Sequence, residues 1–276
     1  MVQIGKYNTL RIVKELDFGI YLDGEEYGEI LMPKRYVPDN CKIDDTIEAF
    51  IYFDSEDRII ATTEKPIAIV GDFAFLKVVS VNSVGAFLDW GLPKDLLVPF
   101  REQKVNMEEG KSYIVYIYVD YASKRIAASA KLDKHLDNLP PKYQVNEQVD
   151  LLIYSQTDIG YKAIINNLHW GILYKNEVFT TLQKGQKIKG YIKKIREDEK
   201  IDLCLQLPGY EKVDEIAESI LEKIRLNNGT IKISDKSPAE EIYDKFQISK
   251  KSFKKAIGAL YKERKINISE SNITLL

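Results

Sequence analysis

The feature that most constrains this chain is a repeat within its N-terminal half. Residues 4–13 (IGKYNTLRIV) align with residues 70–79 (VGDFAFLKVV) at an offset of 66, and apolar residues match at nearly every apolar position. Three further pairs of segments keep that offset: 17–23 with 83–89, 31–33 with 97–99, and 47–54 with 113–120. Chance does not hold one register over so many positions, so this part of the chain contains two copies of one small fold.

A weaker third copy follows the segment 139–142 (LPPK), which we interpret as a linker. At an offset of 75 from the second copy, Gly160 aligns with Gly85 and Lys200 aligns with Arg125. The third copy has diverged but keeps the order of the parts. The three copies predict domains at residues 1–64, 66–133 and 143–207.

Each copy is a series of short β-strands separated by turns. In residues 47–53 (IEAFIYF), apolar and polar residues alternate over part of the run, and turn signals occur at Asp23-Gly24 and at residues 54–57 (DSED). Such a pattern gives about five strands in roughly 60 residues, with a glycine at the first turn. It predicts a small closed Greek-key barrel of the oligonucleotide-binding (OB) type.

The hydrophobic period becomes helical from about Tyr210 onwards. Apolar residues recur at spacings of three and four, at Val213, Ile216, Ala217, Ile220, Leu221 and Ile224. Three signals then divide the segment: Asn227-Asn228-Gly229 ends the first helix, Ser237-Pro238 begins a second that runs to about Phe246, and Ser249 caps a third from Lys250 to about Glu263. Short strands at 231–233, 266–268 and 273–275 complete a winged helix-turn-helix over residues 211–276. The predicted fold class is therefore mainly β with an α+β C-terminus: three tandem five-stranded OB-fold barrels and a winged helix.

The segment 17–23 (DFGIYLD), with the later Asp54 and residues 58–62 (RIIAT), resembles the S1 RNA-binding domain. Three such repeats and a C-terminal winged helix resemble the bacterial conserved virulence factor B family. The most telling stretches are 88–99 (LDWGLPKDLLVP), 157–167 (TDIGYKAIINN) and 195–203 (IREDEKIDL). The resemblance covers essentially the whole chain. It implies RNA binding linked to the control of gene expression, with no known catalysis.

The S1 resemblance also implies a binding face with aromatic residues around the first glycine, a residue on the third strand and a basic residue near the end. These positions hold Phe18, Tyr21, Leu31 and Arg58 in the first repeat, Val84, Phe87, Leu97 and Arg125 in the second, and Ile159, Lys162, Tyr174 and Lys200 in the third, with Tyr161 beside them. Phe18 is expected in the core. Tyr21, Phe87 and Tyr174 either stack on bases or fill the barrel cores, and both alternatives stay open.

Many S1 domains carry histidine on the third strand, where the first two repeats carry Leu31 and Leu97. This departure weakens the expectation of strong RNA binding by those two barrels. The third repeat presents basic side chains instead, at Lys162, Lys187, Lys189, Lys193, Lys194, Arg196 and Lys200. A single strand offers bases that stack on aromatic side chains and phosphates that bind Lys and Arg, so a binding face needs both aromatic and basic residues.

The third helix of the C-terminal domain is expected to bury its apolar side and to expose lysines. Since this is the recognition helix of its fold, the lysines are candidates for nucleic-acid contact, although a solvated helix face is the alternative. Lysines favour contact with the backbone over base reading. The predicted RNA-binding set is Tyr21, Arg58, Phe87, Arg125, Tyr161, Lys162, Tyr174, Lys193, Lys194, Lys200, Lys250, Lys251, Lys254 and Lys255.

Charge is distributed unevenly, although the net charge is only −2. Residues 1–142 hold 18 Lys and Arg against 23 Asp and Glu, a net of −5, and residues 143–276 hold 22 against 19, a net of +3. A polyanion is therefore expected to bind mainly to the C-terminal half.

No catalytic motif, cofactor or metal site is expected. Neither His135 nor His169 has a Cys or carboxylate at ligand or triad spacing, and the phosphate-binding loops GxxxxGK[ST] and GxGxxG are absent from the sequence. The two cysteines, Cys41 and Cys204, are expected to be reduced and mostly buried. No apolar run of membrane-spanning length and no signal peptide is seen, so a cytoplasmic location is expected.

The leading hypothesis is binding of single-stranded RNA by the third barrel and the winged helix, without catalysis and with an effect on transcript fate or translation. One alternative is a regulator that reads duplex DNA through the winged helix. A second is an interaction scaffold on the ribosome or on RNA-processing proteins, which the leucines on the third strands favour.

Overall fold

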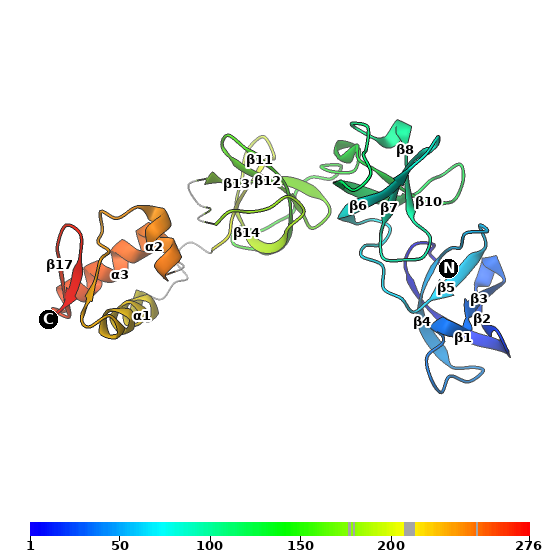
Figure 1. Cartoon of the computed structure of the whole chain (residues 1–276), viewed down its shortest axis with the longest axis horizontal. Coiled ribbons are helices and arrows are strands. Elements are labelled where there is room, and N and C mark those ends of the chain that lie inside the picture. The colour runs from blue at the N-terminus through cyan, green and yellow to red at the C-terminus, as the bar shows by residue number, and fades with distance from the viewer. Residues whose placement is uncertain (176–177, 179, 207–212, 247) are drawn as a thin grey trace. The chain divides into compact units, whose positions relative to one another are not determined.

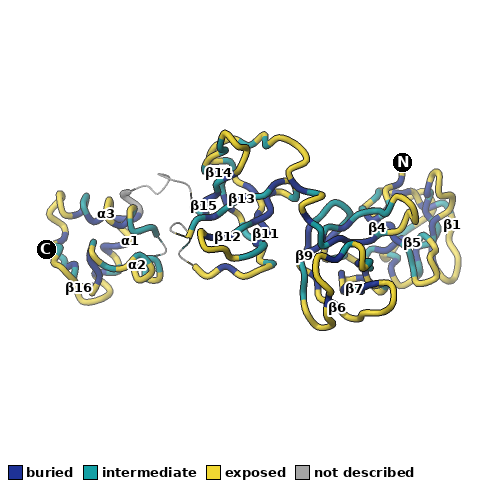
Figure 2. Tube along the Cα trace, turned by 90° about the horizontal axis from the view of Figure 1, so that it is seen from above, coloured by how far each residue is buried: buried dark blue, intermediate teal, exposed yellow. Residues whose placement is uncertain are grey.

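The computed structural model describes residues 1–175, 178, 180–206, 213–246 and 248–276 (Figure 1). The chain divides into two compact units, residues 1–140 with 166–169 and residues 141–165 with 170–276. Three five-stranded β domains and a helical C-terminal domain confirm the predicted fold class. Buried positions run along the strands and helices, and most turns are exposed (Figure 2).

Barrel 1 is closed by five strands in the order β1-β2-β3-β5-β4. The strands are β1 (Tyr7–Leu16), β2 (Gly19–Asp23), β3 (Glu29–Pro33), β4 (Thr46–Phe53) and β5 (Ile59–Thr62). Because successive side chains of a strand point to opposite faces, Ile20 and Leu22 of β2 are buried while Tyr21 between them lies on the outer face.

Barrel 2 repeats this plan with β6 (Phe73–Val81), β7 (Gly85–Asp89), β8 (Leu96–Pro99), β9 (Ser112–Val119) and β10 (Ile126–Ser129). Its sheet has the order β10-β9-β6-β7-β8, and the edge strands β8 and β10 lie beside each other. Ala86 and Leu88 of β7 point into the core and place Phe87 on the outer face.

The first two barrels share one hydrophobic cluster. Phe50 of β4 lies on the outer face of barrel 1, and its ring centroid is 5.8 Å from that of Trp90 in barrel 2. Ile60 of β5 is only 5% exposed and belongs to the same cluster. The first unit is therefore held together by apolar packing between the barrels as well as within each.

Barrel 3 is closed by β11 (Gln148–Thr157), β12 (Gly160–Ile165), β13 (His169–Tyr174), β14 (Lys187–Ile195) and β15 (Ile201–Cys204), in the order β11-β12-β13-β15-β14. Among the described residues, its core is aliphatic apart from the ring of Tyr161 and that of Tyr143 at its margin. Cys204 is buried and Cys41 half-buried, and neither forms a disulfide.

The C-terminal domain contains α1 (Val213–Leu226), β16 (Thr230–Ile231), α2 (Ala239–Phe246), α3 (Lys250–Lys262), β17 (Ile266–Ile268) and β18 (Ile273–Leu275). The strands form a sheet in the order β16-β18-β17. Ser249 caps α3 by accepting a hydrogen bond from the Ser252 N–H at 3.1 Å, and Gly229 has the left-handed φ of +79° expected after α1. The predicted helical onset near Tyr210 lies outside the described residues.

Candidate nucleic-acid interface

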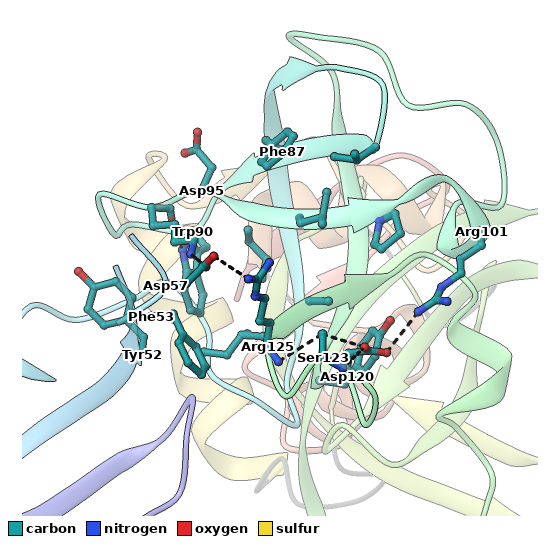
Figure 3. Close-up of a pocket in the computed structure, with 18 of the residues that line it drawn as sticks. Tyr52, Phe53, Asp57, Phe87, Trp90, Asp95, Arg101, Asp120, Ser123 and Arg125 are labelled. Atoms are coloured by element: carbon teal, nitrogen blue, oxygen red, sulfur yellow. Dashed lines mark hydrogen bonds and ion pairs between the residues drawn. The ribbon is translucent and has the colours of Figure 1, made fainter. Parts of the chain in front are cut away.

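The outer face of barrel 2 contains a groove of about 710 Å³ (Figure 3). Its apolar floor comes from four strands: Phe87 of β7, Leu97 of β8, Tyr118 of β9 and Ala127 of β10. Phe87, Leu97 and Tyr118 are half-buried, so their side chains remain accessible. We call this site the barrel 2 groove.

Charged side chains surround this floor. Arg125 lies 2.6 Å from one carboxylate oxygen of Asp57 and Lys94 lies 2.7 Å from the other, although Asp57 belongs to the β4–β5 turn of barrel 1. Figure 3 shows the Asp57–Arg125 pair, and on the other side Arg101 lies 3.3 Å from Asp120. These cations are thus already matched by carboxylates.

The electrostatics of the groove follow from these pairs. The hydrogen bond from Lys94, together with the positive charges of Lys94 and Arg125, holds the pKa of Asp57 below its ordinary value. Burial and the nearby Asp89 raise the pKa of Asp95, a further carboxyl that lines the groove. An aromatic floor with cations at its rim suits a single-stranded nucleic acid, whose bases stack and whose phosphates accept from Arg and Lys.

Barrel 1 corrects one prediction. Phe18, expected in the core, is 55% exposed, because it lies in the turn between β1 and β2, where strand alternation does not direct it inward. Its ring is edge-on to that of Tyr21, with centroids 6.3 Å apart, and the ammonium of Lys14 lies 5.2 Å from the Tyr21 ring. Arg58 is engaged in ion pairs with Asp54 at 2.7 Å and Glu56 at 2.9 Å.

The structure of barrel 3 corrects two further predictions, those for Tyr161 and for Tyr174. Tyr161 is 7% exposed and lies in the barrel core, because the residue directly after the first glycine of each repeat points inward, as Ile20 and Ala86 do. The RNA contact predicted for Tyr161 is therefore wrong. Lys162, one residue later, lies on the outer face.

The third-strand position of the third repeat is Ile172, not Tyr174. The Lys175 N–H donates to the Ile159 carbonyl as the Lys34 N–H donates to the Phe18 carbonyl, so Tyr174 corresponds to Pro33. The parallel pairing agrees, since Ile172 pairs with Asp202 where Leu31 pairs with Ile60.

Tyr174 keeps a half-buried ring, and its hydroxyl donates to Asp202 at 3.3 Å and accepts a hydrogen bond from Arg196. Among the predicted lysines of this barrel, Lys193 is half-buried and Lys194 is exposed. Lys200 is exposed and pairs with Asp198 at 2.7 Å.

The four predicted lysines of α3 differ in whether they contact the rest of the domain or are exposed. The Lys250 ammonium donates to the Ser237 carbonyl at 2.7 Å, so it ties α3 to the turn before α2. Lys251, Lys254 and Lys255 are exposed, and Lys254 lies 3.7 Å from Asp235. Lys251 and Lys255 thus remain the clearest candidates for phosphate contact in this domain.

Sequence reasoning missed several groove residues. Tyr118 alternates with the buried Ile117 in β9, which was a readable signal for an outer-face aromatic. Arg101 follows the third strand of its repeat, a position to which the S1 resemblance assigned no role. Asp57 and Lys94 come from different repeats, so aligning the repeats could not bring them together.

Comparison with known proteins agrees with this architecture. Residues 4–64 and 70–130 match the S1 domain family, and residues 218–275 match the CvfB-like winged helix domain family. Both are nucleic-acid-binding domain families rather than enzyme families. No helix in the described part of the chain is long and apolar enough to cross a membrane.

Two curated relatives resemble the chain over most of its length. "Uncharacterized protein YitL" of Bacillus subtilis is 28% identical over 270 residues, which are 95% of this chain and 90% of that protein. "Conserved virulence factor B" of Staphylococcus aureus is 28% identical over 251 residues, covering 86% and 81%. A solved multidomain protein with nucleic acid binding domains, from Streptococcus pneumoniae, is 24% identical and covers 99% of this chain and 98% of that one, with a TM-score of 0.43. With two S1 domains and a CvfB-like winged helix, the chain is a homologue of conserved virulence factor B, as its sequence predicted.

Proposed function

We propose that this protein binds single-stranded RNA without catalysing a reaction on it, and that it thereby influences gene expression after transcription. The observation that carries the proposal is the barrel 2 groove, where Phe87 and Tyr118 provide aromatic surface beside Arg101 and Arg125. Base stacking on such residues contributes about 1–3 kcal/mol per base, and every base has a face to stack. A duplex hides those faces, so the groove favours an unpaired strand.

The winged helix would add contacts to the backbone. Lys251 and Lys255 present point charges on the recognition helix, and point charges suit phosphates better than base edges. Binding at this domain would therefore raise affinity with little sequence preference.

The test of this proposal is a comparison of three ligands of equal length: single-stranded RNA, single-stranded DNA and duplex DNA, each at two salt concentrations. We expect single-stranded RNA to bind more tightly than duplex DNA, with an affinity that falls as salt rises. Tighter binding to duplex DNA would favour a transcription regulator. Binding of none of the three would favour the interaction scaffold.

Replacing Asp57 by asparagine is expected to strengthen RNA binding. The substitution removes the carboxylate that pairs with Arg125 and Lys94, and Arg125 then becomes available for phosphates, while Lys94 keeps its hydrogen bond to the Asp54 carbonyl at 2.6 Å. The dependence of log affinity on log salt should steepen by about 0.7 units for each new phosphate contact, the value that applies to a single strand. Fluorescence anisotropy with a labelled RNA at four salt concentrations measures both quantities.

The matched control for that variant is Asp39→Asn, which changes the net charge equally at an exposed position outside the groove. If both variants strengthen binding to the same extent, overall charge is responsible and Asp57 does not compete with phosphate.

Replacing Lys251 and Lys255 together by alanine is expected to lower the salt slope by about two units, since each lost phosphate contact removes about one. The melting temperature should hardly change, because exposed lysines contribute little to stability and alanine favours helix. The control is the Lys232→Ala, Lys265→Ala variant, which removes the same charge from the same domain outside α3. An equal slope in the lysine variant and the wild type would exclude α3 from phosphate contact.

A further inference from the structure

The outer face of barrel 3 carries an aromatic pair with lysines around it. The rings of Tyr154 in β11 and Trp170 in β13 meet edge to face, with centroids 5.0 Å apart, and both residues are half-buried. Lys162 of β12 approaches both rings, with its ammonium 3.6 Å from the Trp170 centroid and 5.9 Å from that of Tyr154. The ammonium of the exposed Lys184 lies 6.0 Å from the Tyr154 ring.

This cluster is peculiar to the third barrel. Tyr154 occupies the bulge in the first strand, where the pairing register shifts, and the same bulge holds Val13 in barrel 1 and Val79 in barrel 2. Trp170 lies two residues before Ile172, and the equivalent residues before Leu31 and Leu97 are Glu29 and Asp95. Barrel 3 thus has an indole where the other two barrels have a carboxylate.

The core of barrel 3 does not require these rings. Among the described residues, the buried cluster that fills the barrel consists mainly of aliphatic side chains, and neither Tyr154 nor Trp170 belongs to it. Two large aromatic side chains on an outer face, with ammonium groups beside them, suit a ligand that has flat rings and negative charge. An acidic peptide would supply the charge but no ring to stack, so the chemistry favours an unpaired nucleic-acid strand.

We infer that Tyr154, Lys162 and Trp170 form a second stacking site for unpaired bases of RNA, with Lys184 contacting an adjoining phosphate. This inference rests on the proposed function and adds a site on barrel 3 to the groove on barrel 2. It includes Lys162, which the S1 repeat pattern assigns to the binding face, but its aromatic residues are not among those that the pattern assigns there.

Tryptophan fluorescence tests the site directly, because the chain has only two tryptophans and Trp90 is 3% exposed. A 12-nucleotide unstructured RNA is titrated into the full chain and into Trp170→Phe, and the difference between the two signals isolates Trp170. Anisotropy of the labelled RNA records binding in parallel. We expect the Trp170 emission to be quenched in step with binding.

Affinity measurements supply the second readout. Trp170→Ala should weaken binding between about fivefold and 150-fold with an unchanged salt slope, whereas Lys184→Ala should lower the slope by about one unit. Tyr191→Ala is the control, since Tyr191 is a half-buried aromatic on β14 of the same barrel and lies outside the cluster. It should bind RNA as the wild type does.

The outcomes separate the two proposals. RNA that saturates the protein without quenching Trp170 overturns the barrel 3 site and leaves the proposed function in place. Quenching of equal size by polyglutamate overturns stacking as the mode of contact. Absence of any RNA binding overturns both. If Trp170→Ala lowers the melting temperature sharply, its affinity no longer tests the barrel 3 site. The quenching of Trp170 in the wild type and the salt slope of Lys184→Ala then test the site.

Discussion

Replacing Phe87 by alanine is expected to weaken the binding of single-stranded RNA by about 1–3 kcal/mol, a factor of roughly 5 to 150 in Kd. Phe87 is the aromatic residue of β7 on the floor of the barrel 2 groove, and its neighbours Ala86 and Leu88 form the core beneath it. Because its ring lies on the outer face, its removal takes away a stacking surface and leaves the core intact. The salt slope should not change, since no charge is lost.

Phe75→Ala is the matched control for this prediction. Phe75 belongs to β6 of the same barrel and is 37% exposed, but it does not line the groove. We expect it to leave the RNA affinity unchanged. A Phe87→Ala variant that binds RNA as well as the wild type, while retaining its melting temperature, would remove the groove from the binding surface.

Replacing Gly85 by alanine is expected to destabilise the first unit by about 3 kcal/mol, at the upper end of the usual cost of overpacking. A Cβ at this position would collide with the Val98 carbonyl and with the backbone of Pro99 on the facing strand. Backbone atoms cannot move aside as a flexible side chain does. The equivalent Gly19 and Gly160 face the carbonyls of Met32 and Leu173, so the same close approach of strands explains the glycine of all three repeats.

Gly110→Ala provides the comparison within the same barrel. Gly110 has a φ of +80°, but a Cβ added there would meet no atom within 4 Å, so alanine costs only the backbone strain of about 1–2 kcal/mol. Urea unfolding of both variants is followed by Trp90 emission in a Trp170→Phe background. Equal destabilisation by the two substitutions would mean that the strand approach at Gly85 is not the constraint.

The sequence predicted the architecture well because each part of it has a local signal. The constant offset between the first two repeats predicted that barrel 2 has the same fold as barrel 1. In the C-terminal domain, the helical period predicted the helices, and Ser249 and Gly229 marked helix ends. The alternation around each first glycine was also readable. Applied to Gly160, that alternation places Tyr161 inward and Lys162 outward, so the error at Tyr161 was avoidable. The misplacement at Tyr174 was also avoidable, because the spacing of 12 residues from the first glycine to the third-strand position, as from Gly85 to Leu97, leads from Gly160 to Ile172.

Other features had no signal in one sequence. The ion pairs of Asp57 with Lys94 and Arg125 depend on how barrels 1 and 2 pack, which no pattern within a repeat encodes. The uneven charge predicted RNA binding mainly in the C-terminal half, whereas the proposed groove lies on barrel 2.

In the complex that we propose, single-stranded RNA lies in the barrel 2 groove. The most direct measurement is photo-crosslinking of a 4-thiouridine RNA to the full chain, followed by mass spectrometry of the linked peptides. We predict crosslinks in the peptides of β7 and β9, which carry Phe87 and Tyr118, and their loss when unlabelled RNA competes. Crosslinks confined to other parts of the chain, under conditions where the RNA saturates the protein, would contradict the claim.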